Sequence, residues 1–274
     1  MHRALGNTSH ESRTGNTSGR PQFPRETRIF AIFGPLRAVF ADCHVGRRPD
    51  DDGPFLQALD ETARRGAKEI SLLGDIFHFF IAHPKFQTPS IARFLQAAQD
   101  LAARGVSITY IEGNREFFLR GSYAESRFHE VCDTQTFEEG GRRFFLTHGD
   151  LLNEKDLPYR FWRFLSKNPV SRAALAVVPK KAGNRFVWKV EARLYRSNFK
   201  HKTRLPVEMI RAYAEQRFRE GVDVLLLGHF HRSWTEKVGT GTVEILPAFV
   251  EERKWMEIAD DGTTRLVSLG AGDR

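Results

Sequence analysis

Five short stretches of the sequence share one pattern, in which an apolar run ends at a residue that can bind a metal ion, with a glycine nearby. The first stretch, residues 39–46, contains Asp42 and His44, and residues two apart on an extended strand end lie on the same face. Glycine permits positive φ angles and close backbone approach at such strand-to-loop corners. The other four stretches are Gly74-Asp75, Gly113-Asn114-Arg115-Glu116, His148-Gly149-Asp150 and Gly228-His229-Phe230-His231.

These stretches supply enough oxygen and nitrogen donors for two metal ions that share a bridging carboxylate. Polar side chains at the ends of several strands of one sheet are the usual layout of an α/β active site. Two divalent ions held close together can activate a bound water molecule. The sequence therefore predicts a hydrolytic dinuclear centre built from Asp42, His44, Asp75, Asn114, His148, His229 and His231.

The order of these stretches resembles the five-block signature of the calcineurin-like metallophosphoesterases, which reads D-x-H, G-D, G-N-H-D/E, G-H and G-H-x-H. The resemblance covers the chain from Val39 to Ile258. In the third block this chain has Arg115 where most members have histidine, which resembles the UDP-2,3-diacylglucosamine hydrolases of lipid A biosynthesis. The resemblance implies an α/β fold, a four-layer sandwich of two mixed β-sheets flanked by helices, with a helical insertion as a cap.

The resemblance also implies a role for each donor. Asp75 would bridge the two ions, which are expected to be Mn²⁺, although Fe, Zn and Mg also suit such ligands. Asp150 would either orient the imidazole of a metal ligand without binding the metal itself or be purely structural. Asp42, His44 and His231 would complete one site and Asn114, His148 and His229 the other, and Asp75, Asn114, Arg115 and His148 would be the catalytic residues.

Arg115 constrains the reaction. An arginine stays charged at physiological pH, so it cannot protonate a leaving alkoxide as a histidine can. It can bind phosphate oxygens through two parallel hydrogen bonds. Arg115 therefore favours a leaving group that departs without protonation, as in the cleavage of a pyrophosphate.

The composition is that of a folded domain preceded by a polar N-terminal segment. At 274 residues and 41% apolar content the chain suits one α/β domain, expected over residues 28–274, and polar residues 1–27 are expected to be disordered. The apolar patch at residues 29–33 is too short for a signal-peptide core or a membrane span. The two cysteines, Cys43 and Cys132, indicate a reducing compartment, so a cytoplasmic location is expected. Cys43 is expected to be a small buried residue.

Strands should alternate with helices in the first half of the chain. Apolar spacing predicts helices over residues 54–65 and 91–103, and a weaker one over 117–128. After His231 four short strands are expected, at 234–238, 243–246, 254–258 and 265–267, forming an antiparallel closing sheet. This alternation is typical of a layered α/β fold.

The interval between His148 and His229 is 81 residues, whereas the earlier metal blocks follow one another after 33, 39 and 34 residues. A helical insertion at about residues 151–220 is therefore predicted. It holds 17 Lys and Arg against 6 Asp and Glu, a net charge of +11, while the whole chain carries +8. Its expected substrate contacts, besides Arg115, are Phe161, Trp162, Asn198, Lys200 and Lys202, and Arg196 belongs to the same polar cluster.

Three functions fit these features. The first is a pyrophosphatase that acts on an anionic, UDP-linked lipid at the inner face of a membrane and releases UMP and a lipid sugar 1-phosphate. The second is a nucleotide or nucleic-acid phosphodiesterase that uses the basic insertion to bind phosphate backbones, and it is disfavoured because the histidine acid is absent. The third is a binding module on an inactive scaffold, which retention of all seven donors argues against. After Gly-Asp the lipid A branch usually has an acidic residue and then an Asp-Asp pair, whereas this chain has the different stretch 76–84. Its histidines, His78 and His83, either contact a different group of the substrate or are surface histidines.

Overall fold

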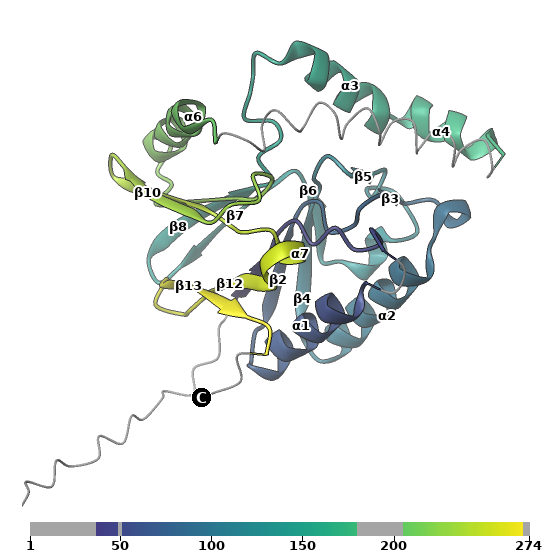
Figure 1. The fold of residues 1–274 in the computed structure, drawn as a ribbon, viewed down its shortest axis with the longest axis horizontal. Helices are drawn as coiled ribbons and strands as arrows, with labels where there is room; N and C mark the ends of the chain where they lie inside the picture. Colours follow the sequence, from purple (N-terminus) through teal and green to yellow (C-terminus); the bar gives the residue numbers. More distant parts are fainter. Residues whose placement is uncertain (1–36, 49–50, 180–204, 271–274) are drawn as a thin grey trace, which may run out of the picture. The chain divides into compact units, whose positions relative to one another are not determined.

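A computed structural model describes residues 37–48, 51–179 and 205–270 (Figure 1). Its helices are α1 (Gly53–Arg64), α2 (Pro89–Ala103), α3 (Leu157–Lys167), α4 (Pro169–Val177), α6 (Val207–Arg219) and α7 (Phe249–Glu252), with 3₁₀ turns at Pro84–Phe86 and Glu125–Arg127. Its strands are β1 (Arg37–Phe40), β2 (Glu69–Leu73), β3 (Phe80–Ile81), β4 (Ser107–Ile111), β5 (Glu116–Phe117), β6 (Glu130–Cys132), β7 (Thr134–Glu139), β8 (Arg142–Thr147), β9 (Val224–Leu227), β10 (Trp234–Val238), β11 (Gly241–Ile245), β12 (Lys254–Ile258) and β13 (Thr264–Ser268).

The strands form two mixed sheets and one short strand pair. The first sheet has the order β13-β12-β1-β2-β4-β6, in which β1, β2, β4 and β6 are parallel and β12 and β13 join antiparallel. The second has the order β10-β11-β9-β8-β7, with β11, β9 and β8 parallel and antiparallel strands at both edges. β3 pairs with β5. In each sheet the central strands are therefore parallel, and their carboxyl ends lie on the same side of the sheet.

Side-chain alternation along the buried strands shows that these elements form four layers. Phe40 packs in the cluster that α1 and α2 cover, whereas its neighbours Val39 and Ala41 belong to a second cluster with residues of both sheets. On β9, Leu226 lies in that second cluster, and Leu225 lies in a third cluster with α6. Because successive strand residues point to opposite faces, the order is α1 and α2, first sheet, second sheet, α6. The fold predicted from the sequence is confirmed.

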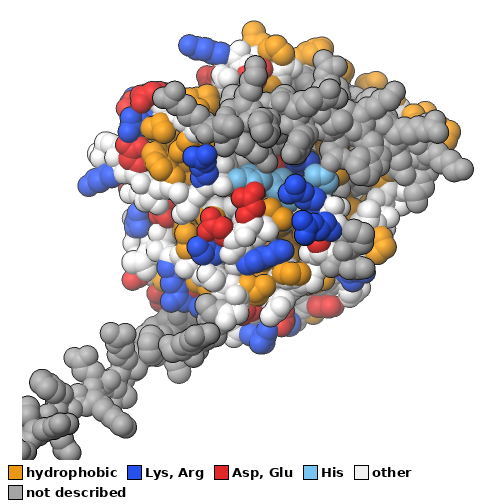
Figure 2. Space-filling view, viewed as in Figure 1, with side chains coloured by type: hydrophobic (Ala, Val, Ile, Leu, Met, Phe, Trp, Pro, Cys, Tyr) orange, Lys and Arg blue, Asp and Glu red, His pale blue; other side chains and the backbone are white. Residues whose placement is uncertain are grey.

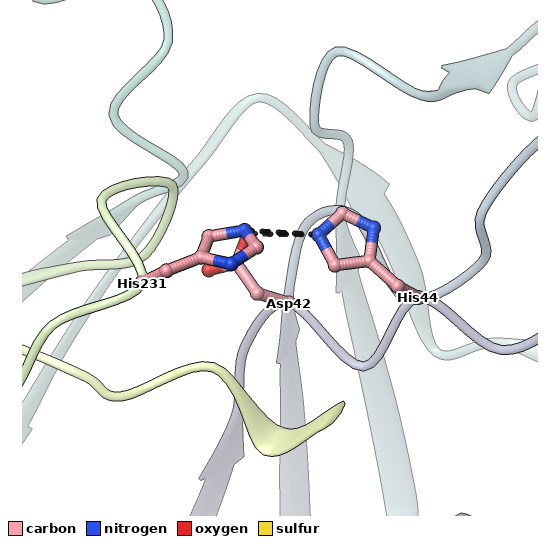
Figure 3. A group of neighbouring side chains, drawn as sticks. All are labelled: Asp42, His44 and His231. Atoms are coloured by element: carbon pink, nitrogen blue, oxygen red, sulfur yellow. Dashed lines mark hydrogen bonds and ion pairs between the residues drawn. The ribbon is translucent and has the colours of Figure 1, made fainter. Parts of the chain in front are cut away.

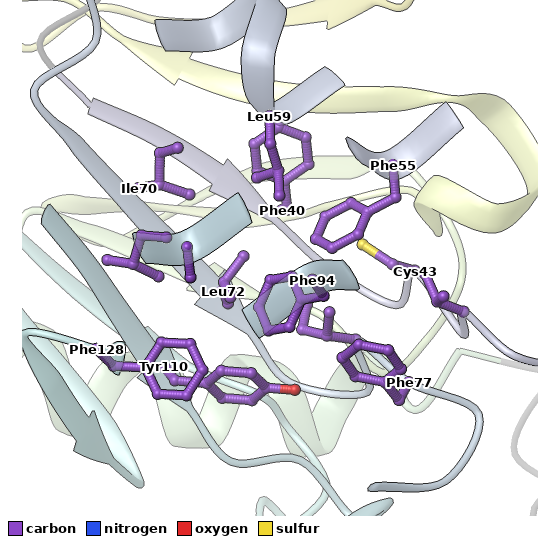
Figure 4. Packing of buried hydrophobic residues seen from close by; sticks show 14 of the residues in the cluster. Phe40, Cys43, Phe55, Leu59, Ile70, Leu72, Phe77, Phe94, Tyr110 and Phe128 are labelled. Atoms are coloured by element: carbon purple, nitrogen blue, oxygen red, sulfur yellow. The ribbon is translucent and has the colours of Figure 1, made fainter. Parts of the chain in front are cut away.

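The cluster beneath α1 and α2 is rich in aromatic rings (Figure 4). Phe94 of α2 is fully buried there, with its ring centroid 5.3 Å from that of Phe77 and 5.8 Å from that of Phe55. Phe40 stacks on Trp255 at 5.5 Å. These residues lie under the strand ends, so they support the loops that follow the strands.

Replacement of Phe94 by alanine should lower the free energy of unfolding by about 3–5 kcal/mol, because it leaves a cavity among rings that cannot all move inward. Chemical denaturation would measure this change. Gln96→Ala, at an exposed position of α2, should cost less, since it removes an exposed hydrogen bond to Asp100 and no buried ring. Equal losses in the two variants would contradict the assigned packing.

Comparison with the predicted elements gives two corrections. The helices predicted at 54–65 and 91–103 are confirmed as α1 and α2. The helix predicted at 117–128 is wrong: β5 ends at Phe117, and only the 3₁₀ turn Glu125–Arg127 is helical in that segment. The expected antiparallel closing sheet is also wrong, because β10 and β11 extend the second sheet while β12 and β13 extend the first. Local alternation predicts a strand but not its partner.

The described part of the insertion is helical, as predicted. Asp156 accepts a hydrogen bond from the backbone N–H of Tyr159 at the start of α3, and Asn168 caps α4 in the same way through Ser171. Ile210, Ala214 and Phe218 are the buried face of α6. No helix in the described ranges has the length and apolar character needed to cross a bilayer. Residues 1–27, Asn198, Lys200, Lys202 and Arg196 lie outside the described residues.

Candidate metal centre

The seven predicted donors follow the carboxyl ends of five parallel strands. Asp42 and His44 follow β1, Asp75 follows β2, and Asn114 follows β4. In the second sheet His148 directly follows β8, and His229 and His231 follow β9. Long-range backbone contacts join these loops: the N–H of Asp42 donates to the carbonyl of Gly74 at 3.2 Å, and the N–H of Gly228 to that of His148 at 3.1 Å.

Five of the seven donors have a left-handed backbone. The φ angles are 51° at Asp42, 46° at His44, 52° at Asp75, 71° at His229 and 54° at His231. Positive φ is uncommon for residues other than glycine, and such strain accumulates at functional sites. Asp42 and His44 do converge, but strand alternation is not the reason, because both lie beyond the end of β1 and have a left-handed backbone.

One group of donors consists of Asp42, His44 and His231 (Figure 3). The Nε2 atoms of His44 and His231 are 3.0 Å apart, and each points toward Oδ1 of Asp42, at 3.7 Å and 3.3 Å respectively. The other carboxylate oxygen of Asp42 accepts a hydrogen bond from the backbone N–H of His229 at 2.7 Å. Asp42 is therefore anchored by one oxygen and presents the other to the two imidazoles.

The second group lies around His148. The ring Nδ1 of His148 is 2.9 Å from the carbonyl oxygen of Leu73, so Nδ1 carries the hydrogen and Nε2 is left as a lone-pair donor. This Nε2 lies 3.3 Å from Oδ1 of Asn114 and 3.5 Å from Oδ1 of Asp75. The ring centroid of His229 is 5.1 Å from that of His148. Asn114, His148 and His229 are thus neighbours, and the assignment of these three residues to one metal ion remains a prediction.

The carboxylate of Asp42 lies close to both groups. One of its oxygens is within 4.8 Å of ligand atoms of His44 and His231, and one is within 4.8 Å of ligand atoms of Asp75 and His148. The resemblance assigned the bridging role to Asp75 instead. Asp75 lies between Arg115 and His148. Its Oδ2 is 3.4 Å from Nε of Arg115, and its Oδ1 is 3.5 Å from Nε2 of His148. Its role as the bridge remains a prediction.

The chemistry of these donors fits cations. In the second group Nε2 of His148 and the Oδ1 atoms of Asn114 and Asp75 face one another, and this set of nitrogen and oxygen atoms can ligate a positive ion. Oδ1 of Asp42 is buried and accepts no hydrogen bond from any described residue. Burial lowers the pKa of His148, but the negative charges of Asp75, Asp42 and Asp150 outweigh it and raise that pKa overall. Oxygen and imidazole ligands suit Mn²⁺, Fe²⁺ or Zn²⁺.

Glycines allow the loops to approach one another. A Cβ at Gly74 would lie 2.4 Å from Nδ1 of His148, and one at Gly113 would lie 2.5 Å from Oδ1 of Asp75. Gly74 has a φ of 75°, but Gly113 has no positive φ. The sequence-based expectation of positive φ thus holds at Gly74, whereas at Gly113 only the close approach requires glycine.

Glu116 was not among the predicted site residues, but its carboxylate holds two of the loops that carry them. Its Oε2 accepts hydrogen bonds from the backbone N–H groups of Asp75 (3.0 Å) and Gly113 (2.8 Å), and its Oε1 accepts one from Ile76 (2.9 Å). Burial, and next the charge of Asp75, raise the pKa of Glu116 to about 7. One side chain thus joins two donor-bearing loops. Its position in the third block is the signal that could have identified it.

Arg115 and the two unusual histidines have different surroundings. The guanidinium of Arg115 is buried beside Asp75 and donates a hydrogen bond to the carbonyl of His78 at 3.1 Å. The ring of His78 is 6.3 Å from that of His44, so His78 lies beside the donor groups. His83 instead caps the 3₁₀ turn, since its Nδ1 accepts a hydrogen bond from the N–H of Lys85.

Asp150 contacts the insertion. It accepts hydrogen bonds from the hydroxyl of Tyr159, at 2.6 Å, and from Nη1 of Arg163. Burial favours a raised pKa for Asp150, but the charge of Arg163 outweighs it and lowers that pKa to about 2. The imidazole of His148 is oriented by Leu73 instead. The alternative of a structural role for Asp150 is therefore the better description.

The predicted substrate contacts are only partly described. Phe161 lies on α3 with 64% of its surface exposed, whereas the side chain of Trp162 lies outside the described residues. Histidine side chains reach the surface among Lys and Arg side chains (Figure 2). A pocket beside His229 is lined by residues from α3, α6, the loops before these helices and the loop after β9, namely Gly149, Asp150, Asn153, Asp156, Tyr159, Pro206, Met209, His229 and Phe230.

A four-layer sandwich that gathers two carboxylates, four imidazoles and one amide at its strand ends defines a metallophosphoesterase. The chain belongs to the UDP-2,3-diacylglucosamine hydrolase family. It is 31% identical over 207 residues to the UDP-2,3-diacylglucosamine hydrolase of Pseudomonas putida, with 73% of this chain and 83% of the relative covered. It is 30% identical over 201 residues to that of Stenotrophomonas maltophilia, with 70% and 80% covered.

The solved structures that resemble the chain are more distant. One is a dimetal phosphatase from Danio rerio, with a TM-score of 0.45, 15% identity, and coverage of 86% of this chain and 100% of that one. No family model matches the chain. The chain is thus a hydrolase by its sequence relatives.

Proposed function

We propose that the protein hydrolyses the pyrophosphate bond of UDP-2,3-diacylglucosamine or a closely similar UDP-linked lipid, and releases UMP and a lipid sugar 1-phosphate. The observation that carries this proposal is the convergence of all predicted donors with Arg115 in place of a histidine. Support also comes from the named activity of the relatives. Bound divalent ions, which we propose to be Mn²⁺, would supply an activated water and charge neutralisation.

The residues of the chain have separable tasks in this proposal. Asp42, His44 and His231 would hold one ion, and Asn114, His148 and His229 the other, with Asp75 between them. Arg115 would bind the phosphate oxygens on which negative charge develops. Glu116 keeps the loops of Asp75 and Asn114 in register through its three backbone hydrogen bonds. No group with an acidic proton is required, because the departing phosphate is a stable anion.

The cap supplies the surface for the acyl chains. The apolar residues of α3 and α4 point outward, with exposed fractions of 64% at Phe161, 68% at Phe164 and 77% at Val170. An exposed apolar patch of this kind marks a ligand or membrane surface. With Lys and Arg nearby to attract anionic headgroups, it supports action of the enzyme at the cytoplasmic surface of a membrane. Asn198, Lys200 and Lys202 stay predicted contacts.

The proposal is tested with purified protein and Mn²⁺ on UDP-2,3-diacylglucosamine, on UDP-N-acetylglucosamine and on duplex DNA. We expect the lipid to be the preferred substrate and UMP to be the nucleotide product. DNA should not compete at physiological salt, because binding driven by phosphate contacts falls steeply with salt. Preference for the unacylated nucleotide sugar, or cleavage of DNA, would refute the proposal.

Changing Phe161 and Phe164 together to serine should raise KM for a long-chain substrate about tenfold or more and leave KM for a short-chain analogue nearly unchanged, since the lost contacts are with the acyl chains. Steady-state kinetics with both substrates measures this. Leu266→Ser, at an exposed apolar residue of β13, is the matched control and should change neither value. The same double variant should bind anionic liposomes less well. Equal effects on both substrates would rule out a lipid-binding role for this face.

A further inference from the structure

Helix α3 is amphipathic, and its polar face is the one turned toward the sandwich. Tyr159, Arg163 and Lys167 are spaced four residues apart and therefore lie on one face. All three contact residues at the strand ends, whereas Phe161 and Phe164 are exposed. The contact between α3 and the sandwich is therefore made through these polar side chains and not through Phe161 and Phe164.

Arg163 is the centre of this contact. It is buried, with 8% of its surface exposed. Its Nη1 donates to the carbonyl of Gly113 at 3.0 Å and to Asp150, and its Nη2 donates to the carbonyl of Glu112 at 3.1 Å. Asp133 lies 3.4 Å from Nη2. The guanidinium therefore bonds two successive carbonyls of the loop between β4 and Asn114.

Lys167 acts on the same loop one turn later. Its Nζ donates to the carbonyl of Gly113 at 2.8 Å and lies 3.8 Å from Oε2 of Glu112. Burial lowers the pKa of Lys167, with the charge of Arg163 adding to this effect. Two cations that repel each other thus share one carbonyl oxygen, which directly precedes Asn114 in the chain.

The position of Asn114 depends on this loop. Glu116 holds the loop from the N–H side through Gly113, and Arg163 and Lys167 hold it from the carbonyl side. A buried charge is tolerated only when its hydrogen bonds are made, so the contacts resist displacement of Gly113. Mutation of a residue that holds a metal ligand in position typically lowers the metal affinity or the activity about 10–100-fold.

We propose that Arg163 and Lys167 are positioning residues, through which α3 of the cap holds Asn114 at the second metal site. The cap then does more than bind substrate, since displacement of α3 loosens a metal ligand. This inference rests on the dinuclear centre of the proposed function but not on the lipid substrate.

The test is Arg163→Gln, which removes the charge and the paired N–H groups. We expect the affinity of the weaker of two Mn²⁺ ions, measured by titration calorimetry, to fall about 10–100-fold. The kcat for bis(p-nitrophenyl) phosphate, a small substrate that does not reach the cap, should fall at saturating Mn²⁺. Arg163→Lys and Lys167→Met should give smaller losses, because Arg163→Lys keeps a positive charge and N–H donors at this position and Lys167→Met leaves the hydrogen bonds of Arg163 in place.

Arg172→Gln is the matched control. Arg172 is a cation of α4 that also bonds carbonyls of the sandwich, those of Arg120 and Gly121, but away from the donors. It should leave Mn²⁺ affinity unchanged. The proposal fails if Arg163→Gln folds and binds both Mn²⁺ ions normally, or if only KM for the lipid changes. If Arg163→Gln does not fold, normal Mn²⁺ affinity in Lys167→Met overturns it. Failure of the proposed substrate would leave these measurements intact.

Discussion

Replacement of Asp75 by asparagine should lower turnover by roughly a thousandfold or more, equivalent to about 4 kcal/mol of transition-state stabilisation. The carboxylate lies between His148 and Arg115, where it would neutralise bound cations. Asparagine keeps the shape and can still accept the hydrogen bond from the backbone N–H of Arg115. Steady-state kinetics with excess Mn²⁺ measures the loss.

The Asp75→Asn protein should stay folded. Burial raises the pKa of Asp75, which means that its charge is unfavourable in the absence of cations. Thermal unfolding of the metal-free variant should therefore occur at the wild-type temperature or above it. Asp60→Asn, at an exposed carboxylate of α1 that bonds Arg64 and Arg104, is the control and should retain full activity. Activity within tenfold of wild type would exclude Asp75 as the bridge.

Arg115→Ala should reduce turnover of a pyrophosphate substrate about a hundredfold or more, equivalent to about 2.7 kcal/mol. The buried guanidinium, held by the carbonyl of His78, is the cation that lies against Asp75. Its loss removes charge-assisted hydrogen bonds to oxygens whose charge grows in the transition state, so kcat should fall more than KM rises. Arg64→Ala, at an exposed arginine of α1, should have no effect. A loss under fivefold would refute phosphate binding by Arg115.

Arg115→His extends the same test to the leaving group. An imidazole can donate a proton that arginine cannot, so the ratio of alkyl phosphodiester to pyrophosphate hydrolysis should rise in this variant. The ratio, measured with the two substrates under one Mn²⁺ concentration, is independent of how much active protein is present. An unchanged ratio would show that the leaving-group argument is wrong.

Much of the fold and the centre could be predicted from local patterns. Helices α1 and α2 and the buried face of α6 follow from apolar spacing, and Gly-Asp or His-Gly beside an apolar run marked the strand ends. The segment after Phe117 was predicted as a helix because its apolar residues recur at helical spacing. In the structure, however, β5 pairs with β3, and Leu119 packs into the core. Such long-range pairing overrides weak local preference.

The orientation of α3 shows the same limit. Its apolar residues would ordinarily predict a buried face, yet Phe161 and Phe164 are exposed and Arg163 is buried. Arg163 appeared in the sequence only as one of many basic residues of the insertion. Its four-residue spacing from Tyr159 and Lys167 is a signal, but the role of this spacing depends on contacts with Asp150, which precedes the insertion, and with the carbonyl of Gly113, which is 50 residues away in sequence.

The sequence by itself determined which donors are present, in which order they follow the strands, and that Arg115 excludes a histidine acid, because these properties reside in residue types and short spacings. Only the tertiary structure decided how the donors meet. Asp42 and His44 converge through left-handed turns rather than strand alternation. His148 is oriented by the carbonyl of Leu73, and the loop of Asn114 is held by Arg163. These contacts join residues far apart in the chain, so no local pattern contains them.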